Sequence, residues 1–207
     1  MEKRIYCIGS NSNGYWIDNG IFVDSPELAD IIVFPGGSDV CPENYGCKDL
    51  PEADNWPSAR RDEEEIEIFN SMKPTQMAIG ICRGHQLLAT RFGGILVQDC
   101  SGHWGSTHEI INNRGHRVMT NSYHHQMVYL PSLDPSTYEL LYWSSTKLSN
   151  YYIGDKIDAD LITKEPEIIM FQKEGMPRSL GIQGHPEMMS PNNEFVKIVN
   201  KIVNKYF

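Results

Sequence analysis

The chain has 207 residues, a length that suits one domain with a single buried core. Its formal net charge of -9 repels phosphate backbones, so the composition argues against nucleic acid as a partner. No apolar run approaches the length of a membrane span, and the first residues lack the hydrophobic segment of a secretion signal. We therefore expect one domain over residues 1–207, located in the cytoplasm and without a membrane contact.

The first half of the chain alternates short apolar strands with helices. The predicted strand at 29–37 ends at Pro35 and two glycines, where the backbone turns tightly. The predicted helix at 59–73 opens with the acidic run 62–65, which complements the helix dipole and is interpreted as a solvated helix start. In chain order the elements are a strand at 4–10, a strand at 29–37, a helix at 59–73, a strand at 76–81 and a helix at 83–92.

The second half is less regular, with apolar segments separated by polar loops. Residues 192–207 carry apolar side chains at helical spacing, which predicts a closing amphipathic helix. The alternation of strands and helices favours an α/β domain with a mostly parallel central sheet flanked by helices. Functional groups gather at the carboxyl ends of such strands. The strands predicted in this half, which make the sheet mixed, are 94–99, 116–120, 139–145, 167–172 and 180–184.

A cysteine stands between the buried strand at 76–81 and the helix at 83–92. The stretch GICRG at 80–84 has the spacing of a nucleophile elbow, in which a reactive side chain sits on a sharp strand-to-helix turn. Flanking glycines avoid collisions there, and the helix N-terminus favours thiolate over thiol. The pattern predicts a nucleophile at Cys82, with a small residue in a tight junction as the alternative. The other cysteines are interpreted as small buried hydrophobes: Cys7, Cys41, Cys47 and Cys100.

A nucleophile needs a base, and the base needs a group that orients it. His85 is discounted as the base because it belongs to the helix that leads away from the turn. His185 and Glu187 follow the strand at 180–184, and residues two apart in an extended segment point the same way. Pro186 stiffens the link between them. This segment therefore supplies a base and an orienting carboxylate, as in a Cys-His-Glu triad.

Four segments in this order resemble the class I glutamine amidotransferase superfamily and, within it, the γ-glutamyl hydrolase branch called peptidase family C26. The resemblance covers residues 31–190, most of the chain. It implies a flavodoxin-like α/β fold with a nucleophile elbow. It also implies an enzyme that hydrolyses the carbon-nitrogen bond of γ-glutamyl amides with no metal or organic cofactor. The segments are FPGGSDVCPENYG, GICRGHQLLA, NSYHHQ and GIQGHPE.

The same resemblance assigns roles to individual residues. It makes Cys82 the nucleophile, His185 the general base and acid, and Glu187 the group that orients His185. The backbone N–H groups of Gly37 and Arg83 would form the oxyanion hole, with no part for the arginine side chain. The residues that it places around the substrate, for which packing roles are the alternative, are Gln86, Ser122, Tyr123 and His124.

The implied reaction passes through a γ-glutamyl thioester on Cys82. The favoured substrate is glutamine, hydrolysed to glutamate and to ammonia for a partner synthetase or amidoligase. The alternative is a stand-alone hydrolase of γ-glutamyl amines or peptides, which the segments at 35–46 and 121–126 resemble more. A third interpretation is a non-catalytic binding or regulatory member of the fold. The presence of nucleophile, base and orienting group together argues against it.

Two features depart from the family pattern. Gly184 stands where relatives carry a bulky aromatic residue, and we expect it to open space beside His185. The few residues before Pro35 leave little room for the usual helix ahead of the strand at 29–37. A metal site is also weighed because histidines crowd one region, but their spacings match no standard zinc pattern, so no metal is expected. These histidines are His103, His108, His116, His124 and His125.

Overall fold

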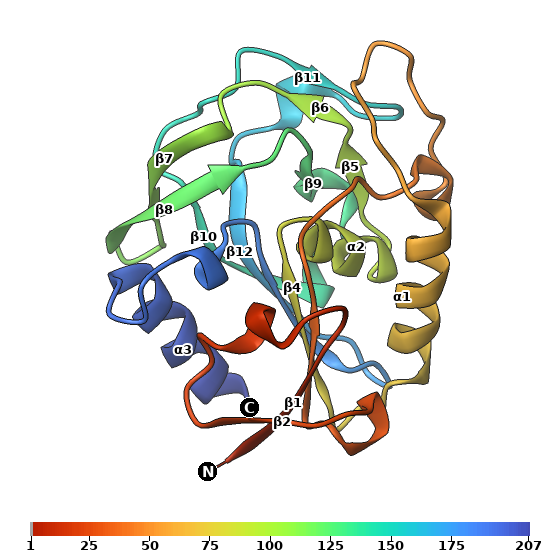
Figure 1. The fold of residues 1–207 in the computed structure, drawn as a ribbon. Coiled ribbons are helices and arrows are strands. Elements are labelled where there is room, and N and C mark those ends of the chain that lie inside the picture. Colours follow the sequence, from red (N-terminus) through yellow and green to blue (C-terminus); the bar gives the residue numbers. More distant parts are fainter. Residues whose placement is uncertain (1) are drawn as a thin grey trace.

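The structure, a computed structural model, describes residues 2–207 and is built around one large sheet (Figure 1). This sheet has nine strands within the described residues. Their order across the sheet is β2 (Gly20–Phe22), β1 (Lys3–Cys7), β3 (Ile31–Phe34), β4 (Met77–Ile81), β13 (Arg178–Ile182), β12 (Pro166–Phe171), β10 (Tyr138–Ser144), β7 (Trp104–Ile111) and β8 (Arg117–Tyr123).

The strand directions confirm the predicted α/β class with a mostly parallel, partly mixed sheet. The ladders that join β2, β1, β3, β4 and β13 are parallel. Those that join β13, β12, β10, β7 and β8 are antiparallel. Within residues 2–207, only β12 and β7 therefore run against the other strands of this sheet. The carboxyl ends of β3, β4 and β13 meet at one edge, which is where ligand sites form in such sheets.

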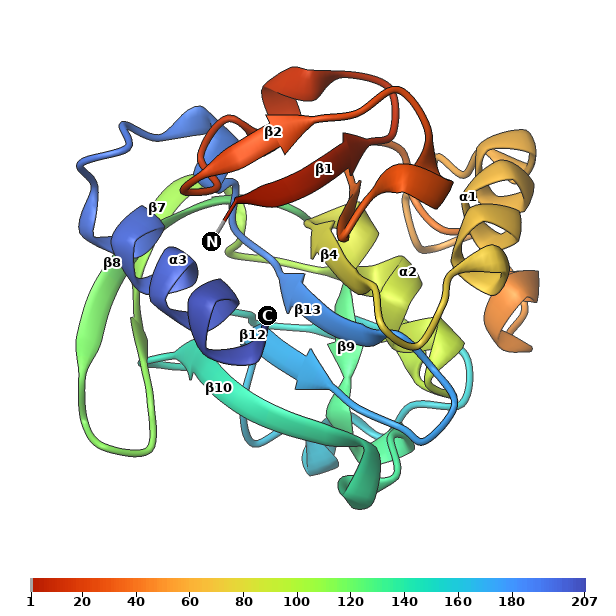
Figure 2. The same ribbon diagram turned by 90° about the horizontal axis from the view of Figure 1, so that it is seen from below.

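Helices cover both faces of the sheet, as Figure 2 shows in the view from below. Alternate residues of β3 point to opposite faces, because side chains alternate along a strand. Ile32 and Phe34 pack with α1 (Ala59–Ser71) and α2 (Arg83–Arg91), whereas Ile31 and Val33 pack with α3 (Glu194–Tyr206). The predicted helices are thus confirmed. Among residues 2–207, no helix has both the length and the apolar character that crossing a bilayer requires.

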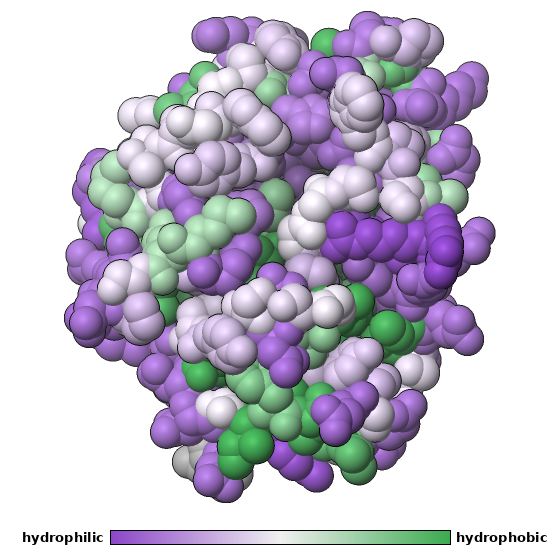
Figure 3. Space-filling model, viewed as in Figure 1, coloured by the Kyte–Doolittle hydropathy of each residue, from purple (hydrophilic) through white to green (hydrophobic). Residues whose placement is uncertain are grey.

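The N-terminal edge of the sheet lacks an α-helix between β1 and β3, as the short segment leads us to expect. Within the described residues, two 3-10 turns at Asn11–Gly14 and Pro26–Leu28 and the edge strand β2 fill this connection. Strand β2 pairs in parallel with β1 and was not predicted. Apolar side chains gather on the surface near this edge, while most of the face seen in Figure 3 is polar.

Two small sheets lie beyond the main one. The segment at 94–99, predicted as one strand, is divided between β5 (Ile95–Val97) and β6 (Asp99–Cys100). Strand β5 pairs with β9 (Met127–Tyr129), and β6 pairs with β11 (Tyr152–Ile153). Their apolar side chains form a separate small cluster around Val97 and Tyr129. Of the predicted substrate residues, Ser122 and Tyr123 end β8 of the main sheet, and His124 lies in the short connection from β8 to β9.

Candidate active site

Cys82 stands on the predicted sharp turn between β4 and α2. Its backbone has φ 50° and ψ -107°, a conformation that a side chain adopts only at a steric cost. A Cβ on Gly80 would collide with the backbone of Gly84, and one on Gly84 would collide with the carbonyl of Phe34. Both flanking glycines are therefore required for the close packing of α2 on the sheet. The helix begins at Arg83, so its positive N-terminal end lies directly behind the thiol.

His185 and Glu187 follow β13, the parallel neighbour of β4. The imidazole Nδ1 lies 2.7 Å from the Glu187 carboxylate, so the predicted pair forms. The side chain of Asn121 binds the His185 backbone on both sides. It accepts from the N–H at 2.7 Å and donates to the carbonyl at 3.1 Å. Asn121 lies in the motif NSYHHQ, but sequence reasoning gave it no role.

Folding brings the thiol and this imidazole to one chamber of about 440 Å³. Burial lowers the pKa of His185, but its interactions with the Cys82 thiol and the Glu187 carboxylate outweigh that effect and raise the pKa to about 10. Its Nε2 makes no further hydrogen bond within residues 2–207. A protonated ring at neutral pH would stabilise a thiolate and hold a proton for a leaving group.

His85 takes no part in this arrangement, as predicted. Burial lowers the pKa of its ring to about 3. The ring lies against Gly181, where a Cβ would come within 2.7 Å of it, and packs edge-on against Phe171. His85 is thus a neutral core residue.

Cys82 also lines a second, smaller chamber of about 200 Å³, which we call the inner chamber. Gly37 and Arg83 line it, which places both predicted oxyanion residues beside the sulfur. Gly37 has φ +139°, in the region that favours glycine. Both residues therefore border the same chamber as the Cys82 sulfur.

Three of the predicted substrate residues line the inner chamber: Gln86, Tyr123 and His124. Ser122 does not. Its fully buried hydroxyl donates to the carbonyl of His103 at 2.7 Å, so it fixes the strand that carries its neighbours. Segments far apart in the chain contribute further residues of the wall, to which the sequence assigned no role: Asp39, Trp56, Trp104, His125 and Gln126.

Gly184 corrects an expectation about space. A Cβ at this position would collide with the hydroxyl of Thr120 and lie 3.3 Å from the ring of Phe195. The position faces the interior between β8 and α3 rather than the chamber beside His185. The missing side chain therefore serves close packing, and it does not enlarge the substrate site.

The acidic run at 62–65 is a second correction. Glu63 and Glu64 are exposed as expected, but Asp62 and Glu65 are buried and bind the side chain of Arg83. Residues three apart lie on one helix face, and here that face turns toward the sheet and meets a cation. The run is therefore not simply a solvated helix start.

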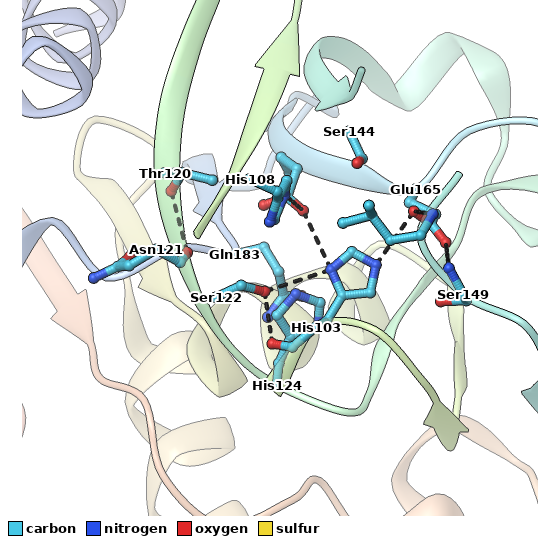
Figure 4. Close-up of polar contacts among 12 residues, drawn as sticks. His103, His108, Thr120, Asn121, Ser122, His124, Ser144, Ser149, Glu165 and Gln183 are labelled. Atoms are coloured by element: carbon cyan, nitrogen blue, oxygen red, sulfur yellow. Dashed lines mark hydrogen bonds and ion pairs between the residues drawn. The ribbon is translucent and has the colours of Figure 1, made fainter. Parts of the chain in front are cut away.

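A cluster of buried histidines and glutamates lies next to the wall of the inner chamber that His124 forms (Figure 4). Its members are His103, His108, His124, Glu165 and Glu167. His103 Nε2 lies 3.2 Å from Glu165, and His108 Nε2 lies 2.8 Å from Glu167. Burial raises the pKa of Glu165, but hydrogen bonds from His103 and from two backbone N–H groups outweigh it and lower the pKa to about 2. Only part of the histidine-rich region meets here, because His116 lies near Tyr142 and His125 lies between Asp39 and Asp99.

Three possible ligand atoms of this cluster, one each from His103, His124 and Glu167, lie within 4.8 Å of one another. The two glutamates pair with imidazoles of the cluster, Glu165 with His103 and Glu167 with His108. His124 Nδ1 also contacts the carbonyl of Gln126 at 2.8 Å, which ties the cluster to the chamber wall. We therefore assign the cluster the role of supporting the wall segment.

The fold and the cysteine turn define a member of the class I glutamine amidotransferase-like superfamily. More specifically, residues 23–132 match the family model of Peptidase C26, so the chain belongs to this family. A glutamine amidotransferase-like protein, the YvdE homolog of Lactococcus lactis subsp. cremoris, is 32% identical over 121 residues. The match covers 49% of this chain and 64% of that protein, less than two thirds of its length.

Two further comparisons report a sequence match over a shorter segment and a solved structure with a similar fold. The arginine-specific small chain of carbamoyl phosphate synthase from Bacillus subtilis is 42% identical over 64 residues, 31% of this chain and 17% of that protein. A solved structure from Thermoplasma acidophilum, described as part of a GMP synthase, has a TM-score of 0.62 at 16% identity. The match covers 100% of this chain and 96% of that protein's chain, which shows a shared fold.

Proposed function

We propose that the protein is a cysteine hydrolase that cleaves γ-glutamyl amide bonds. Cys82 is the nucleophile, His185 the general acid and base, and Glu187 the group that orients His185. One observation carries the proposal: a cysteine on a strained turn at the start of a helix shares a chamber with an imidazole that a carboxylate holds. These are the three parts that acyl transfer through a thioester requires.

The reaction begins when the Cys82 thiolate attacks the γ-carbonyl carbon of the substrate. The carbonyl oxygen becomes an oxyanion, for which the N–H groups of Gly37 and Arg83 are the proposed donors. Protonated His185 gives its proton to the departing nitrogen as the carbon-nitrogen bond breaks. Water then attacks the γ-glutamyl thioester while neutral His185 takes a proton from it. Glutamate leaves, and the Cys82 thiolate and protonated His185 are restored.

The inner chamber is the proposed site of the glutamyl portion. Gln86, Tyr123 and His124 line it, and the Cys82 sulfur lies 4.0 Å from the carbonyl oxygen of Tyr123. Gln126 also lines this chamber, and its buried side-chain oxygen has no hydrogen-bond partner in residues 2–207, so we assign it as a candidate acceptor for the substrate. Ser122 contributes indirectly, through the strand it holds.

Glutamine is the first candidate substrate, with its ammonia delivered to a partner synthetase or amidoligase. The likeness to a carbamoyl phosphate synthase small chain supports this assignment. A stand-alone hydrolase of γ-glutamyl amines or peptides is the second candidate. The roughly 440 Å³ chamber on the His185 side supports it, because the departing group must leave past His185 and this space exceeds what ammonia needs. Met188 and Trp104 line that chamber and are exposed.

A chloroketone analogue of glutamine tests the nucleophile. We expect it to alkylate Cys82 and to abolish turnover of γ-glutamyl substrates. Cys82→Ala and His185→Ala should be inactive, while Cys47→Ala, which changes a buried cysteine outside both chambers, keeps its activity. Turnover of Cys82→Ala at the wild-type rate, or labelling of another cysteine, contradicts the proposal. A folded chain that binds the analogue without any turnover would instead identify a binding or regulatory protein.

The leaving group is tested by comparing free glutamine with γ-glutamyl amines. Each substrate is assayed alone and with candidate synthetases. Glutamine turnover that rises with a partner supports the amidotransferase assignment. Turnover of γ-glutamyl amines by the isolated chain supports the hydrolase assignment.

A further inference from the structure

A buried ion network joins α1 to the residue that follows Cys82. Arg83 donates through Nη1 to Glu65 and through Nη2 to Asp62. All three side chains are at most 1% exposed, so water screens these charges little. The contacts explain why the two acidic residues face inward at the start of α1.

Arg61 extends the network to the loop on the other side of the nucleophile. Its Nε donates to Glu65 at 2.7 Å, and its Nη2 donates to the carbonyl oxygens of Pro35 and Gly36, each at 3.0 Å. Gly37 follows at once, and a Cβ there would collide with the Arg61 guanidinium. Glu65 thus connects this loop to the first residue of α2.

The network is also anchored at its far end. The second oxygen of Asp62 accepts from the backbone N–H of Cys41 at 2.7 Å and from the Asn44 side chain at 2.8 Å. All four carboxylate oxygens of Asp62 and Glu65 therefore have donors. The two anions are balanced by two arginines, so the network is neutral and its members have little freedom to move.

Stability alone is a weak reason for such a network, because buried ion pairs are often no more stabilising than apolar residues of similar volume. The geometry of the oxyanion hole is a stronger reason for the network. An oxyanion donor acts only when its nitrogen lies about 2.7 to 3.1 Å from the developing charge. The two proposed donors belong to segments far apart in the chain, and the rigid arginine forks link both segments to one helix.

We propose that Asp62 and Glu65 are positioning residues for the oxyanion hole. Acting through the side chains of Arg83 and Arg61, they fix the spacing between the peptide N–H groups on the two sides of Cys82. The inference rests on the proposed function, and it gives the Arg83 side chain a role that the sequence did not suggest.

Arg61→Ala tests this role with less risk to folding than a change at the buried Arg83, because the Arg61 side chain is about a quarter exposed. We expect kcat to fall about 10- to 100-fold, with KM changing less than about threefold. The γ-aldehyde analogue of glutamine supplies a second readout. The Cys82 sulfur adds to its carbonyl carbon, and the former carbonyl oxygen then occupies the oxyanion site. Its affinity should fall by the same factor as kcat, while the affinity for L-glutamate stays unchanged.

Arg60→Ala is the matched control. Arg60 is the neighbouring arginine of α1, but its side chain is 90% exposed and pairs with Glu64 on the outer face. It should keep wild-type kcat. Arg61→Lys retains the charge beside Glu65 but has no fork to reach the two loop carbonyls, so it should recover only part of the loss.

Wild-type kcat in Arg61→Ala would overturn the positioning role. Equal losses of aldehyde and L-glutamate affinity would also overturn it, because they would show a general collapse of the site. Turnover in Cys82→Ala at the wild-type rate would instead refute the proposed function itself, so the two failures are distinguishable.

Discussion

Three side chains carry the proposed chemistry, and two of them depend on their surroundings. Cys82 depends on the strained turn, while His185 depends on Glu187 and on the backbone bonds from Asn121. The raised pKa of His185 also links stability to pH. The pKa of about 10 in the folded chain exceeds the ordinary 6.5. The contribution of protonated His185 to the free energy of unfolding is therefore complete below pH 6.5 and is lost as the pH rises toward 10.

Glu187→Gln should change both the rate and its pH dependence. The departing nitrogen needs protonated His185, so kcat/KM in the wild type should fall as the pH rises through the pKa of that ring. The Glu187 carboxylate helps to raise this pKa, so its removal should move the falling limb to lower pH. We expect kcat to drop about 100-fold or more, measured in pH-rate profiles.

Glu174→Gln is the control for that change. Glu174 is exposed in the turn between β12 and β13, at the end of the sheet away from Cys82. The Glu174→Gln substitution removes the same charge as Glu187→Gln and should leave the pH-rate profile unaltered. An unshifted alkaline limb in Glu187→Gln would show that the carboxylate does not act on His185.

At the scale of elements, the site depends on how closely α2 approaches β3 and β4. Gly84→Ala would drive a methyl group into the backbone of Phe34. We expect a loss of about 2 to 4 kcal/mol in the free energy of unfolding, measured by urea denaturation. Gly175→Ala is the control. Its φ is +80° but no atom lies near its Cβ position, so it should cost only about 1 kcal/mol. Equal losses in the two variants would contradict the packing argument.

The strands and helices around the site were predictable because local patterns set them. The apolar run of β4, the glycines beside Cys82 and the spacing of His185 and Glu187 all lie within short windows of sequence. Strand β7 was missed because its residues, WGSTHEII, are polar at most positions that a strand pattern weighs. Its hydrogen bonds with β8 and β10 decide its conformation, and local sequence does not encode those partners.

Long-range pairs account for what the sequence did not reveal at the site. The burial of Asp62 and Glu65 depends on Arg83, which meets them only after α1 packs on the sheet. The wall residue Trp104 comes from β7, a strand whose approach to Cys82 is not evident from local sequence. A run of acidic residues is ordinarily exposed to solvent, so the run at 62–65 alone predicts a solvated helix start. Its buried partner, Arg83, lies in another segment and cannot be recognised from the run itself.

At the scale of the whole molecule, one continuous sheet connects all the parts of the site. A cavity of about 540 Å³ at the opposite end of the sheet, beside Met77 and Arg178, has neither cysteine nor histidine among its described lining residues. The proposed chemistry accordingly belongs to the two chambers at Cys82. The sheet also makes the stability of the site a property of the whole domain.

Unfolding should accordingly be cooperative. Because α3 packs on the same sheet that carries β4 and β13, we expect residues 1–207 to unfold in one transition. Far-ultraviolet circular dichroism and tryptophan fluorescence should give the same urea midpoint. Separate midpoints would divide the chain into more than one folding unit.

Trapping the thioester tests the central claim most directly. The enzyme is quenched with acid during turnover of a γ-glutamyl substrate, and its peptides are analysed by mass spectrometry. We predict a γ-glutamyl adduct on the peptide that contains Cys82, and no adduct in Cys82→Ala. Continued turnover with no adduct, or an adduct on another residue, would contradict the account.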